Sequence, residues 1–297
     1  MIRKELWMSA LVAMAVTACG GGSSGGADTT APTVTSVTTT QNSATSLTLT
    51  AAASDNVGVS AYCFTSTATA PSSGDACFQA SNQKTVTVTL PMTQYYVWAK
   101  DAANNVSAAS VSGPCSAAGY TASAASTLPT VCMMTSLGEM VFALENVKAP
   151  VTVANFLTYV NEGFFKDTVF HRVISNFMVQ GGGYTYSSGA YTAKAATHAA
   201  IALEAPAATG LSNTAGTIAM ARTAVLNSAT SQFFVNTVDN SGSLDTGGGG
   251  YAVFGRQISG VSTLSAIKSV AVVANPGTGE LSQPSSPPVI QWALQLK

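Results

Sequence analysis

The first half of the chain alternates apolar and polar residues with a period of two. Runs such as SLTLT, KTVTVTL and YYVWAKD show this alternation, and turn-forming clusters such as SDN and PSSGD separate them. A period of two is the spacing of a strand with one buried face, so these short strands predict a β-sandwich over residues 31–115. Trp98 falls out of phase with Tyr95 and Val97, and we expect it to face away from the inner surface of the sandwich.

The second half, residues 129–297, combines strands with two helices. Short strands around TVFHRVI, FMVQGGG, GTIAMAR, SQFFVNT and YAVFGRQI follow a predicted hairpin at VCMMTSLGEMVFALE. Between Pro150 and Gly163 the large apolar residues stand three and four apart, which predicts an amphipathic helix, and GVSTLSAIKSV predicts another. Many strands with two helices indicate a closed barrel covered by helices. An Ala/Ser/Thr-rich linker, residues 116–128, joins the two domains.

Residues 1–18 have the form of an export signal. The basic residues Arg3 and Lys4 precede a short apolar core, and small residues follow it. The sequence VTAC, which ends at Cys19, also resembles the bacterial lipobox, in which the signal is cut before the cysteine and that cysteine receives the lipid. The Gly/Ser tether over residues 19–30 suits such an anchor, whereas the alternative is an ordinary secreted protein.

The lipobox pattern predicts a protein of the cell envelope, held in the periplasm by a lipid. Gly20 stands where some lipoproteins of the inner membrane carry an aspartate, and this difference favours the outer membrane. After the signal the chain has no apolar run of about eighteen residues, so we expect no membrane-spanning helix.

Charged residues are scarce, at 8% of 297 residues with a formal net charge of −1, and the mean hydropathy is +0.28. A balanced charge of this size argues against nucleic acid and against an acidic partner. The hydrophobicity is spread through alanines and β-branched residues rather than concentrated in one segment. These properties fit two globular domains.

The five cysteines support the prediction of export. If Cys19 is lipidated, four remain, and Cys63 and Cys77 flank a predicted hairpin loop, where an oxidising compartment favours a disulfide. Cys115 and Cys132 bracket the linker, where they either form a second disulfide or remain free thiols. The spacing contains no pair of CxxC motifs, so we predict no zinc site, and the sequence indicates no metal and no other cofactor.

Four blocks of residues, in order along the second domain, carry the functional signal. They are FHRVISNFMVQGGG, TAGTIAMART, SATSQFFVNT and YAVFG. These blocks resemble the cyclophilin-type peptidyl-prolyl isomerases, most closely the bacterial periplasmic branch. The resemblance covers residues 129–297 and implies an eight-stranded antiparallel β-barrel capped by two helices, with its site on the outer face. In the first domain, ASDNVGVSAY and LPMTQYYVWAKDAANNVSAAS resemble bacterial immunoglobulin-like and fibronectin type III-like modules.

The reaction of this family explains why an arginine stands without a nucleophile beside it. Isomerising an Xaa-Pro bond requires only rotation about a partial double bond, whose barrier is about 18–20 kcal/mol. In the twisted bond the proline nitrogen regains a lone pair, which a guanidinium donor stabilises selectively. Arg172 offers such donors, and the resemblance makes it the main catalytic residue. We interpret His171 as a buried, hydrogen-bonded structural residue, because the reaction moves no proton.

The resemblance also assigns the remaining site residues. Phe177 and Gln180 complete the catalytic set, with Gln180 holding Arg172 and the substrate carbonyl. The following residues are expected to bind the proline ring and the extended peptide: Met178, Ala221, Arg222, Gln232, Phe234, Leu244 and Tyr251. Ser243 stands where the cyclosporin-sensitive relatives place a tryptophan, so we expect weak inhibition by cyclosporin.

Together these features predict an isomerase that assists the folding of exported proteins, with proline-containing polypeptides as its partners. One alternative is a catalytically weak module that binds proline-containing segments and is docked by the sandwich. Another is a surface-adhesion protein built on the sandwich, which rests on Trp98. The arginine favours the isomerase, because a pure binder has little need of it. The sequence indicates no ligand for the sandwich domain.

Overall fold

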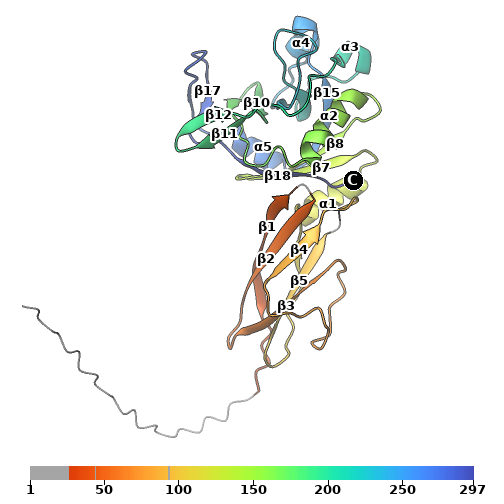
Figure 1. Cartoon of the computed structure of the whole chain (residues 1–297), viewed down its shortest axis with the longest axis vertical. Helices are drawn as coiled ribbons and strands as arrows, with labels where there is room; N and C mark the ends of the chain where they lie inside the picture. Colours follow the sequence, from red (N-terminus) through yellow and green to blue (C-terminus); the bar gives the residue numbers. More distant parts are fainter. Residues whose placement is uncertain (1–26, 44, 93) are drawn as a thin grey trace, which may run out of the picture.

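The period-two runs of the first half form two three-stranded sheets, with strand orders β1-β2-β4 and β3-β5-β6, that pack together (Figure 1). The computed structural model describes residues 27–43, 45–92 and 94–297, so the predicted signal peptide and Cys19 lie outside the described residues. The strands are β1 (Thr33–Ser43), β2 (Ser46–Ser54), β3 (Val59–Thr65), β4 (Gln83–Thr87), β5 (Tyr95–Asp101) and β6 (Ser110–Ser112).

Strand β5 departs from the predicted alternation at Trp98, whose side chain is buried. Trp98 is 4% exposed, packs with Phe78 and Cys63, and donates from its indole Nε1 to Thr65 Oγ1 over 3.3 Å. The loop that carries Phe78 is tied to β3 by the Cys63–Cys77 disulfide, which forms as predicted. The expectation of an exposed Trp98 is therefore wrong, because this loop covers the outer face of the sheet. The adhesion hypothesis loses its support with it.

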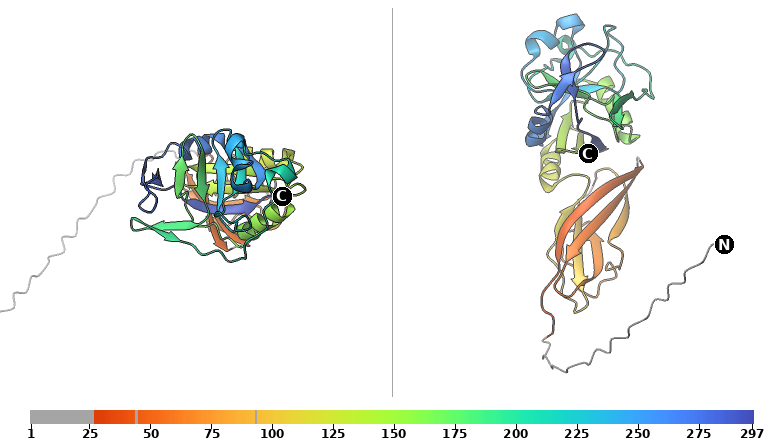
Figure 2. Two further views of the ribbon diagram at one scale, coloured as in Figure 1. Left: turned by 90° about the horizontal axis from the view of Figure 1, so that it is seen from above. Right: turned by 90° about the vertical axis from the view of Figure 1, so that its left-hand side faces the viewer.

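The second half forms a curled eight-stranded antiparallel sheet with the order β18-β7-β8-β15-β13-β14-β10-β9 (Figure 2). Backbone bonds from Ile290 N to Thr168 O (2.7 Å) and from Asp167 N to Ile290 O (2.8 Å) join β18 to the segment before β9. The strands are β7 (Thr130–Thr135), β8 (Gly138–Leu144), β9 (Arg172–Ile174), β10 (Met178–Gly181), β13 (Thr217–Met220), β14 (Phe233–Asn236), β15 (Val253–Ser259) and β18 (Ile290–Gln295). This confirms the predicted mainly β fold.

Two helices cover the core of this sheet, as predicted. Helix α2 (Pro150–Asn161) inserts Phe156, whose ring lies 4.9 Å from that of Phe254. Helix α5 (Val261–Ile267) buries Ile267 in the same cluster. The shorter elements are α3 (Pro206–Thr209), α4 (Ser241–Leu244), the 3-10 helix η1 (Gly247–Gly249), and the hairpins of β11 (Tyr184–Ser187) with β12 (Ala190–Ala193) and of β16 (Val272–Ala274) with β17 (Leu281–Pro284).

The predicted linker contains a helix, α1 (Ala117–Ala125), that packs on β8 and β15. The Ser116 hydroxyl caps its N terminus, and the Ser116 N–H donates to a Glu139 carboxylate oxygen of β8 over 2.6 Å. The Cys115–Cys132 disulfide ties the start of this helix to β7. Of the two alternatives left open for Cys115 and Cys132, the structure therefore has the disulfide, and the residues between the domains are held against the barrel.

The two domains share one hydrophobic cluster. The domains are stacked end to end with the C terminus at their junction (Figures 1 and 2). Met92 N donates to Leu296 O over 2.9 Å across this junction. The buried residues of the cluster are Leu47, Leu49, Val86, Met92, Cys115, Cys132, Val141, Trp292, Leu294 and Leu296. Burial of this apolar surface fixes the domains against each other. Within the described part of the chain, no helix is long and apolar enough to cross a membrane.

Candidate active site

The pairing of three adjacent strands places the predicted site residues on the outer face of the barrel sheet. Strand β9 pairs Arg172 with Gln180 of β10, and β10 pairs Gln180 with Phe234 of β14. The alternate residues Val173 and Val179 are buried in the barrel core. Because successive side chains of a strand point to opposite faces, the same short segments supply the core on one side and the site on the other.

A pocket of about 270 Å³ opens on this outer face. Its apolar floor includes Met178 and Phe234, which are 2% and 4% exposed. Nine of the ten predicted catalytic and peptide-binding residues line it: Arg172, Phe177, Met178, Gln180, Ala221, Arg222, Phe234, Leu244 and Tyr251. The tenth, Gln232, accepts a hydrogen bond at its Oε1 from Gln180 Nε2 over 2.9 Å. The structure thus brings all ten residues together.

The glycines that end the FHRVISNFMVQGGG block make room for this pair of glutamines. Gly182 has a φ of 82°, which favours glycine, and a Cβ at Gly183 would clash with the side chain of Gln232. Glycine at these positions lets Gln232 lie close against the backbone and meet Gln180.

Arg222 and Tyr251 form one rim of the pocket. The Arg222 guanidinium lies 4.5 Å from the centre of the Tyr251 ring. Its Nη2 donates to Gly248 O over 2.6 Å and to Gly250 O over 2.8 Å, which anchors the glycine-rich loop. The Tyr251 N–H donates to Leu244 O over 3.0 Å, so the loop and α4 are held together beside the apolar floor.

Arg172 is held by Glu280, a residue that the sequence analysis did not identify. The guanidinium donates from Nε and Nη2 to the two carboxylate oxygens of Glu280 over 2.6 and 2.7 Å. This hydrogen bonding lowers the pKa of Glu280 to about 2, although partial burial acts in the opposite direction. The Nη1 group lies 3.9 Å from Met178 Sδ at the apolar floor. A bidentate carboxylate fixes the plane of the guanidinium and leaves the Nη1 side facing the pocket.

This arrangement differs from the role expected for Gln180. Among the described residues Gln180 donates to Gln232, and no hydrogen bond joins it to Arg172. Arg172 is held instead by Glu280, which lies in the turn before β17, 108 positions after Arg172 in the chain. It is the last acidic residue of the sequence, within NPGTGEL, and no spacing relates it to Arg172. Only the folded β16–β17 hairpin brings the two together.

Comparison with known proteins identifies the family of the second domain. The family model of the cyclophilin-type peptidyl-prolyl cis-trans isomerases matches residues 130–291. The chain belongs to this family. Peptidyl-prolyl cis-trans isomerase A of Dickeya dadantii is 46% identical over 176 residues, which cover 59% of this chain and 88% of that protein. The cyp18 isomerase of Streptomyces antibioticus is 44% identical, with 56% and 98% covered, and isomerase B of Escherichia coli is 45% identical, with 46% and 82% covered.

The match to the cyclophilin-type isomerases confirms the enzyme class that the four sequence blocks predict. It covers more than half of the chain and spans the strands that carry Arg172, Gln180 and Phe234. The sandwich domain lies outside the matched residues. The matched residues, 130–291, therefore include every residue that lines the pocket described above.

His171 precedes Arg172 in the chain but does not line the pocket. Its ring contacts that of Tyr184, with centres 4.5 Å apart. Loss of hydration lowers the pKa of His171 to about 4, so the ring is neutral near pH 7. Its Nδ1 is buried without a hydrogen-bond partner in the described structure. The ring is thus a packing element, as interpreted, although this nitrogen lacks the expected hydrogen bond.

The loop with Ser243 is held in place by its own hydrogen bonds. Ser243 Oγ donates to Asn240 O over 3.2 Å and does not line the pocket. The next acidic residue, Asp245, accepts from the backbone N–H and the side-chain amide of Asn213 over 2.8 and 2.9 Å. Burial alone would raise the pKa of Asp245, but hydrogen bonds from Ser212 and Asn213 outweigh it and lower the pKa. Leu244 is therefore held in the pocket wall by its neighbours.

Proposed function

We propose that this chain isomerises Xaa-Pro bonds of exported proteins at the cell envelope and so assists their folding. The observation that carries the proposal is the position of Arg172 beside the apolar floor of the open pocket, with its Nη1 side toward the pocket. Uncatalysed isomerisation takes tens of seconds, which makes it a slow step in the folding of many chains.

The geometry supports a division of roles within the reaction. The apolar floor at Phe177, Met178 and Phe234 holds the proline ring while the preceding residue turns. The guanidinium donates to the proline nitrogen as the amide loses its resonance, and this interaction exists only in the twisted state. Because Glu280 already fixes the guanidinium, little reorganisation accompanies the rotation. No covalent intermediate is needed.

An extended substrate adds its main chain along the rim at Ala221 and Arg222. The Ala221 N–H already donates to Gln232 O over 2.9 Å, so this edge offers the substrate the Ala221 carbonyl and the backbone of Arg222. Main-chain recognition is largely independent of side chains, which suits an enzyme with many clients. Tyr251, where many relatives carry histidine, lines the same pocket and is placed to donate to the carbonyl before proline.

The location of the enzyme is proposed from the N-terminal sequence and from the cysteines. Signal cleavage before Cys19 and lipidation of that residue would tether the enzyme in the periplasm, at the outer membrane, because Gly20 follows. The two disulfides of the folded domains fit an oxidising compartment. We assign the sandwich to the immunoglobulin-like or fibronectin type III-like modules, as a spacer between anchor and enzyme.

One observation favours a second function, a proline-peptide-binding module with weak turnover. The Glu280 carboxylate offsets the charge of Arg172 through two short hydrogen bonds, which weakens the electrostatic pull of the guanidinium on the proline nitrogen. In this case the apolar cup binds proline and the arginine contributes little to the rate.

An exchange measurement separates the two functions. We expect NMR exchange spectra of an Ala-Pro peptide to show cis-trans interconversion that the protein accelerates at substoichiometric concentration. A protein that shifts or broadens the peptide resonances by binding, yet leaves the interconversion rate at its uncatalysed value, is the binding module. Membrane fractionation with palmitate labelling tests the anchor, since two or more acyl chains give stable attachment. A mature protein that is unlabelled and free of membranes refutes that part of the proposal.

A further inference from the structure

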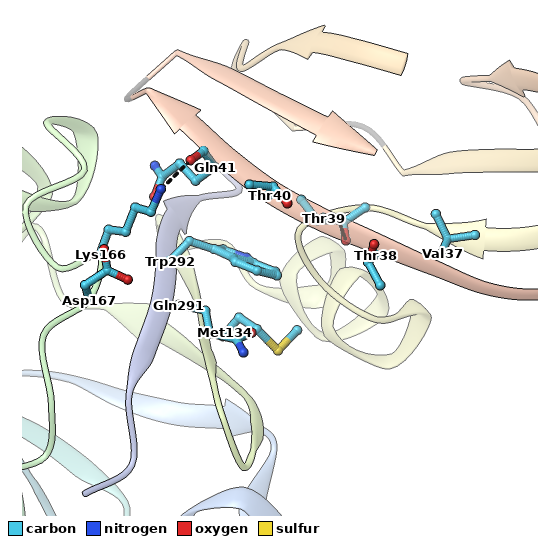
Figure 3. A pocket seen from close by; sticks show the side chains of 11 residues that line it. Val37, Thr38, Thr39, Thr40, Gln41, Met134, Lys166, Asp167, Gln291 and Trp292 are labelled. Carbon is cyan, nitrogen blue, oxygen red and sulfur yellow. Dashed lines mark hydrogen bonds between the residues drawn. The ribbon is translucent and has the colours of Figure 1, made fainter. Parts of the chain in front are cut away.

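A groove runs between strand β1 of the sandwich and the barrel (Figure 3). Its volume is about 480 Å³, and it is separate from the reaction pocket. One side is β1, and the other is formed by β7, β18 and the segment before β9. The lining residues on which the argument depends are Val37, Thr40, Gln41, Met134, Lys166 and Trp292.

The groove follows the free edge of strand β1. All five consecutive residues from Val37 to Gln41 line it, although their side chains alternate between the two faces of the sheet. A surface that touches both faces of a strand runs along its edge. Strand β1 is the end strand of its sheet and pairs with β2 alone in the described structure. An unpaired strand edge presents a row of N–H and C=O groups to any extended chain that reaches it.

Gln41 adds a buried amide with no partner at one end of this edge. The residue is 2% exposed, and neither its Nε2 nor its Oε1 has a hydrogen-bond partner within the described residues. A buried amide without partners is rare, because each unpaired group loses the hydration that it has in water. A donor and an acceptor side by side are complementary to the C=O and N–H of one peptide group.

Apolar side chains lie farther along the groove. Figure 3 shows Trp292 and Met134 below strand β1, with Gln41, Lys166 and Asp167 at the other end. The indole of Trp292 is fixed by its Nε1, which donates to Pro114 O over 3.0 Å. An apolar residue of an extended ligand would pack on this ring while a neighbouring peptide group meets Gln41.

The charges at the groove select against strongly charged ligands. Lys166 donates from Nζ to the backbone oxygen of Gln41 over 2.7 Å, and Asp167 follows it in the chain. One cation and one anion at the same end leave no net charge to attract a highly charged segment. The groove therefore fits an uncharged stretch of polypeptide with alternating apolar residues.

We propose that the groove binds an extended, uncharged segment of an unfolded client chain, which adds to strand β1 as a further strand. Main-chain hydrogen bonds along the edge give the affinity, the Gln41 amide fixes the register, and Trp292 and Met134 receive an apolar side chain. The segment lacks proline, because proline has no N–H to pair with the edge.

This site gives the enzyme two points of attachment on one client. A chain held by the groove presents its nearby prolines to the reaction pocket at a raised local concentration, without any new contact in that pocket. The sandwich then acts as part of a client-binding surface as well as a spacer. Binding at the groove requires no isomerisation, so the inference stands or fails independently of the proposed enzymatic function.

A proline-free peptide tests the site directly. The probe is a fluorescein-labelled peptide of sequence Ser-Thr-Val-Phe-Thr-Val-Ser, titrated against the full mature chain by fluorescence anisotropy. We expect saturable binding that Gln41→Leu weakens by about tenfold, the effect of two lost hydrogen bonds. Asn42→Ala is the matched control, because Asn42 is the next residue, is exposed, does not line the groove, and donates to Thr48 Oγ1 over 2.8 Å. It should change the affinity by less than about twofold.

A second variant and a competition experiment test whether the probe occupies the groove. Thr40→Trp places a large side chain in the groove from an exposed position and should weaken binding of the probe as Gln41→Leu does. The result therefore does not depend on one buried substitution. An excess of Ala-Pro peptide should leave the probe bound. Both variants should retain wild-type turnover of that short peptide, which shows that the barrel is intact.

Three outcomes overturn the proposal. In the first, the wild-type chain does not bind the probe, and the groove holds water only. In the second, Gln41→Leu and Thr40→Trp bind the probe as tightly as the wild type. In the third, the Ala-Pro peptide displaces the probe, which places the probe in the reaction pocket.

Discussion

The reaction pocket and the interdomain groove differ in whether their polar side chains have hydrogen-bond partners within the protein. In the pocket Arg172 is held by Glu280, and Gln180 by Gln232. In the groove both amide atoms of Gln41 lack a partner in the described structure. Donors that are fixed before the substrate arrives need little rearrangement in the transition state, which serves catalysis. A buried amide that gains its partners only from a ligand serves binding.

The two sites also differ in origin. The residues lining the pocket span positions 172 to 251 and come from adjacent strands of one sheet and the loops beside them, whereas the groove uses residues from 37 to 292 in two domains. A site within one sheet is inherited with the fold of a family. A site between domains exists only where this sandwich meets this barrel, and it depends on the cluster that joins them.

Loss of the arginine has the largest expected effect on the pocket. Arg172→Ala should lower kcat by about 10²–10³-fold, the usual effect of removing one fixed transition-state donor, while peptide affinity changes much less. Exchange NMR gives the rate, and a titration of the same peptide gives the affinity. Arg256→Ala is the control, since Arg256 is an exposed arginine of β15 outside the pocket. An Arg172→Ala variant that turns over the peptide at the wild-type rate excludes this residue as the catalyst.

Cyclosporin tests the effect of Ser243, the residue before Leu244 in the pocket wall. Serine lacks both the indole donor and the apolar area that tryptophan gives the cyclosporin-sensitive relatives, so the inhibitor should bind this enzyme about a hundredfold or more weakly than it binds them. Ser243→Trp should restore part of the sensitivity, measured as inhibition of peptide turnover. The catalytic rate should change little, because Ser243 does not line the pocket. Nanomolar inhibition of the unmodified enzyme contradicts this prediction and the assignment of the loop.

The ten site residues could be predicted because their positions follow from short local segments. Arg172 and Gln180 belong to one hairpin, and the pairing of β10 with β14 then brings Phe234 beside them. Alternation within strands decides which residues face the pocket. The period-two runs likewise predict the sandwich, and the cysteine positions predict the Cys63–Cys77 disulfide but leave open whether Cys115 and Cys132 pair.

The features that escaped prediction depend on contacts between distant segments. Glu280 meets Arg172 only through the β16–β17 hairpin, and Trp98 is buried only because a loop folds over its sheet. Helix α1 arises in a segment whose composition suggested a linker, since it is stabilised by packing on the barrel. Periodicity describes which face of an element is apolar, but it does not reveal which other segment covers that face.

Removing the Glu280 carboxylate tests whether the pocket is preorganised. Glu280→Gln should lower kcat by about tenfold with little change in KM, because the amide holds the guanidinium less rigidly while the apolar cup is intact. Glu145→Gln, which removes a carboxylate elsewhere on the barrel and outside the pocket, is the control. An unchanged or increased kcat means that the carboxylate does not assist catalysis but weakens the pull of the guanidinium on the proline nitrogen, as in the binding-module hypothesis.

The pKa of Glu280 predicts the pH range in which this ion pair acts. The carboxyl has an ordinary pKa of 4.5 that Arg172 lowers to about 2, so the stabilisation by the pair is complete above 4.5 and is lost as the pH falls through 2. Neither this pair nor His171, whose pKa is lowered to about 4, changes charge near pH 7. The rate of peptide isomerisation should therefore be flat between about pH 6 and pH 8. A step in that range would reveal a titrating group in the reaction that the pocket does not predict.

The smallest expected effect is on stability, and it compares the paired glutamine of the pocket, Gln180, with the unpaired glutamine of the groove, Gln41. Gln180→Leu leaves Gln232 without its donor and should lower the free energy of unfolding by about 1–3 kcal/mol. Gln41→Leu removes an amide that already lacks partners and should raise the free energy of unfolding by about 1 kcal/mol. Both changes have the same chemistry, so urea denaturation of the two variants isolates the difference in partnering. If Gln41→Leu destabilises the chain as much as Gln180→Leu does, Gln41 is satisfied within the protein, and the contrast between pocket and groove fails.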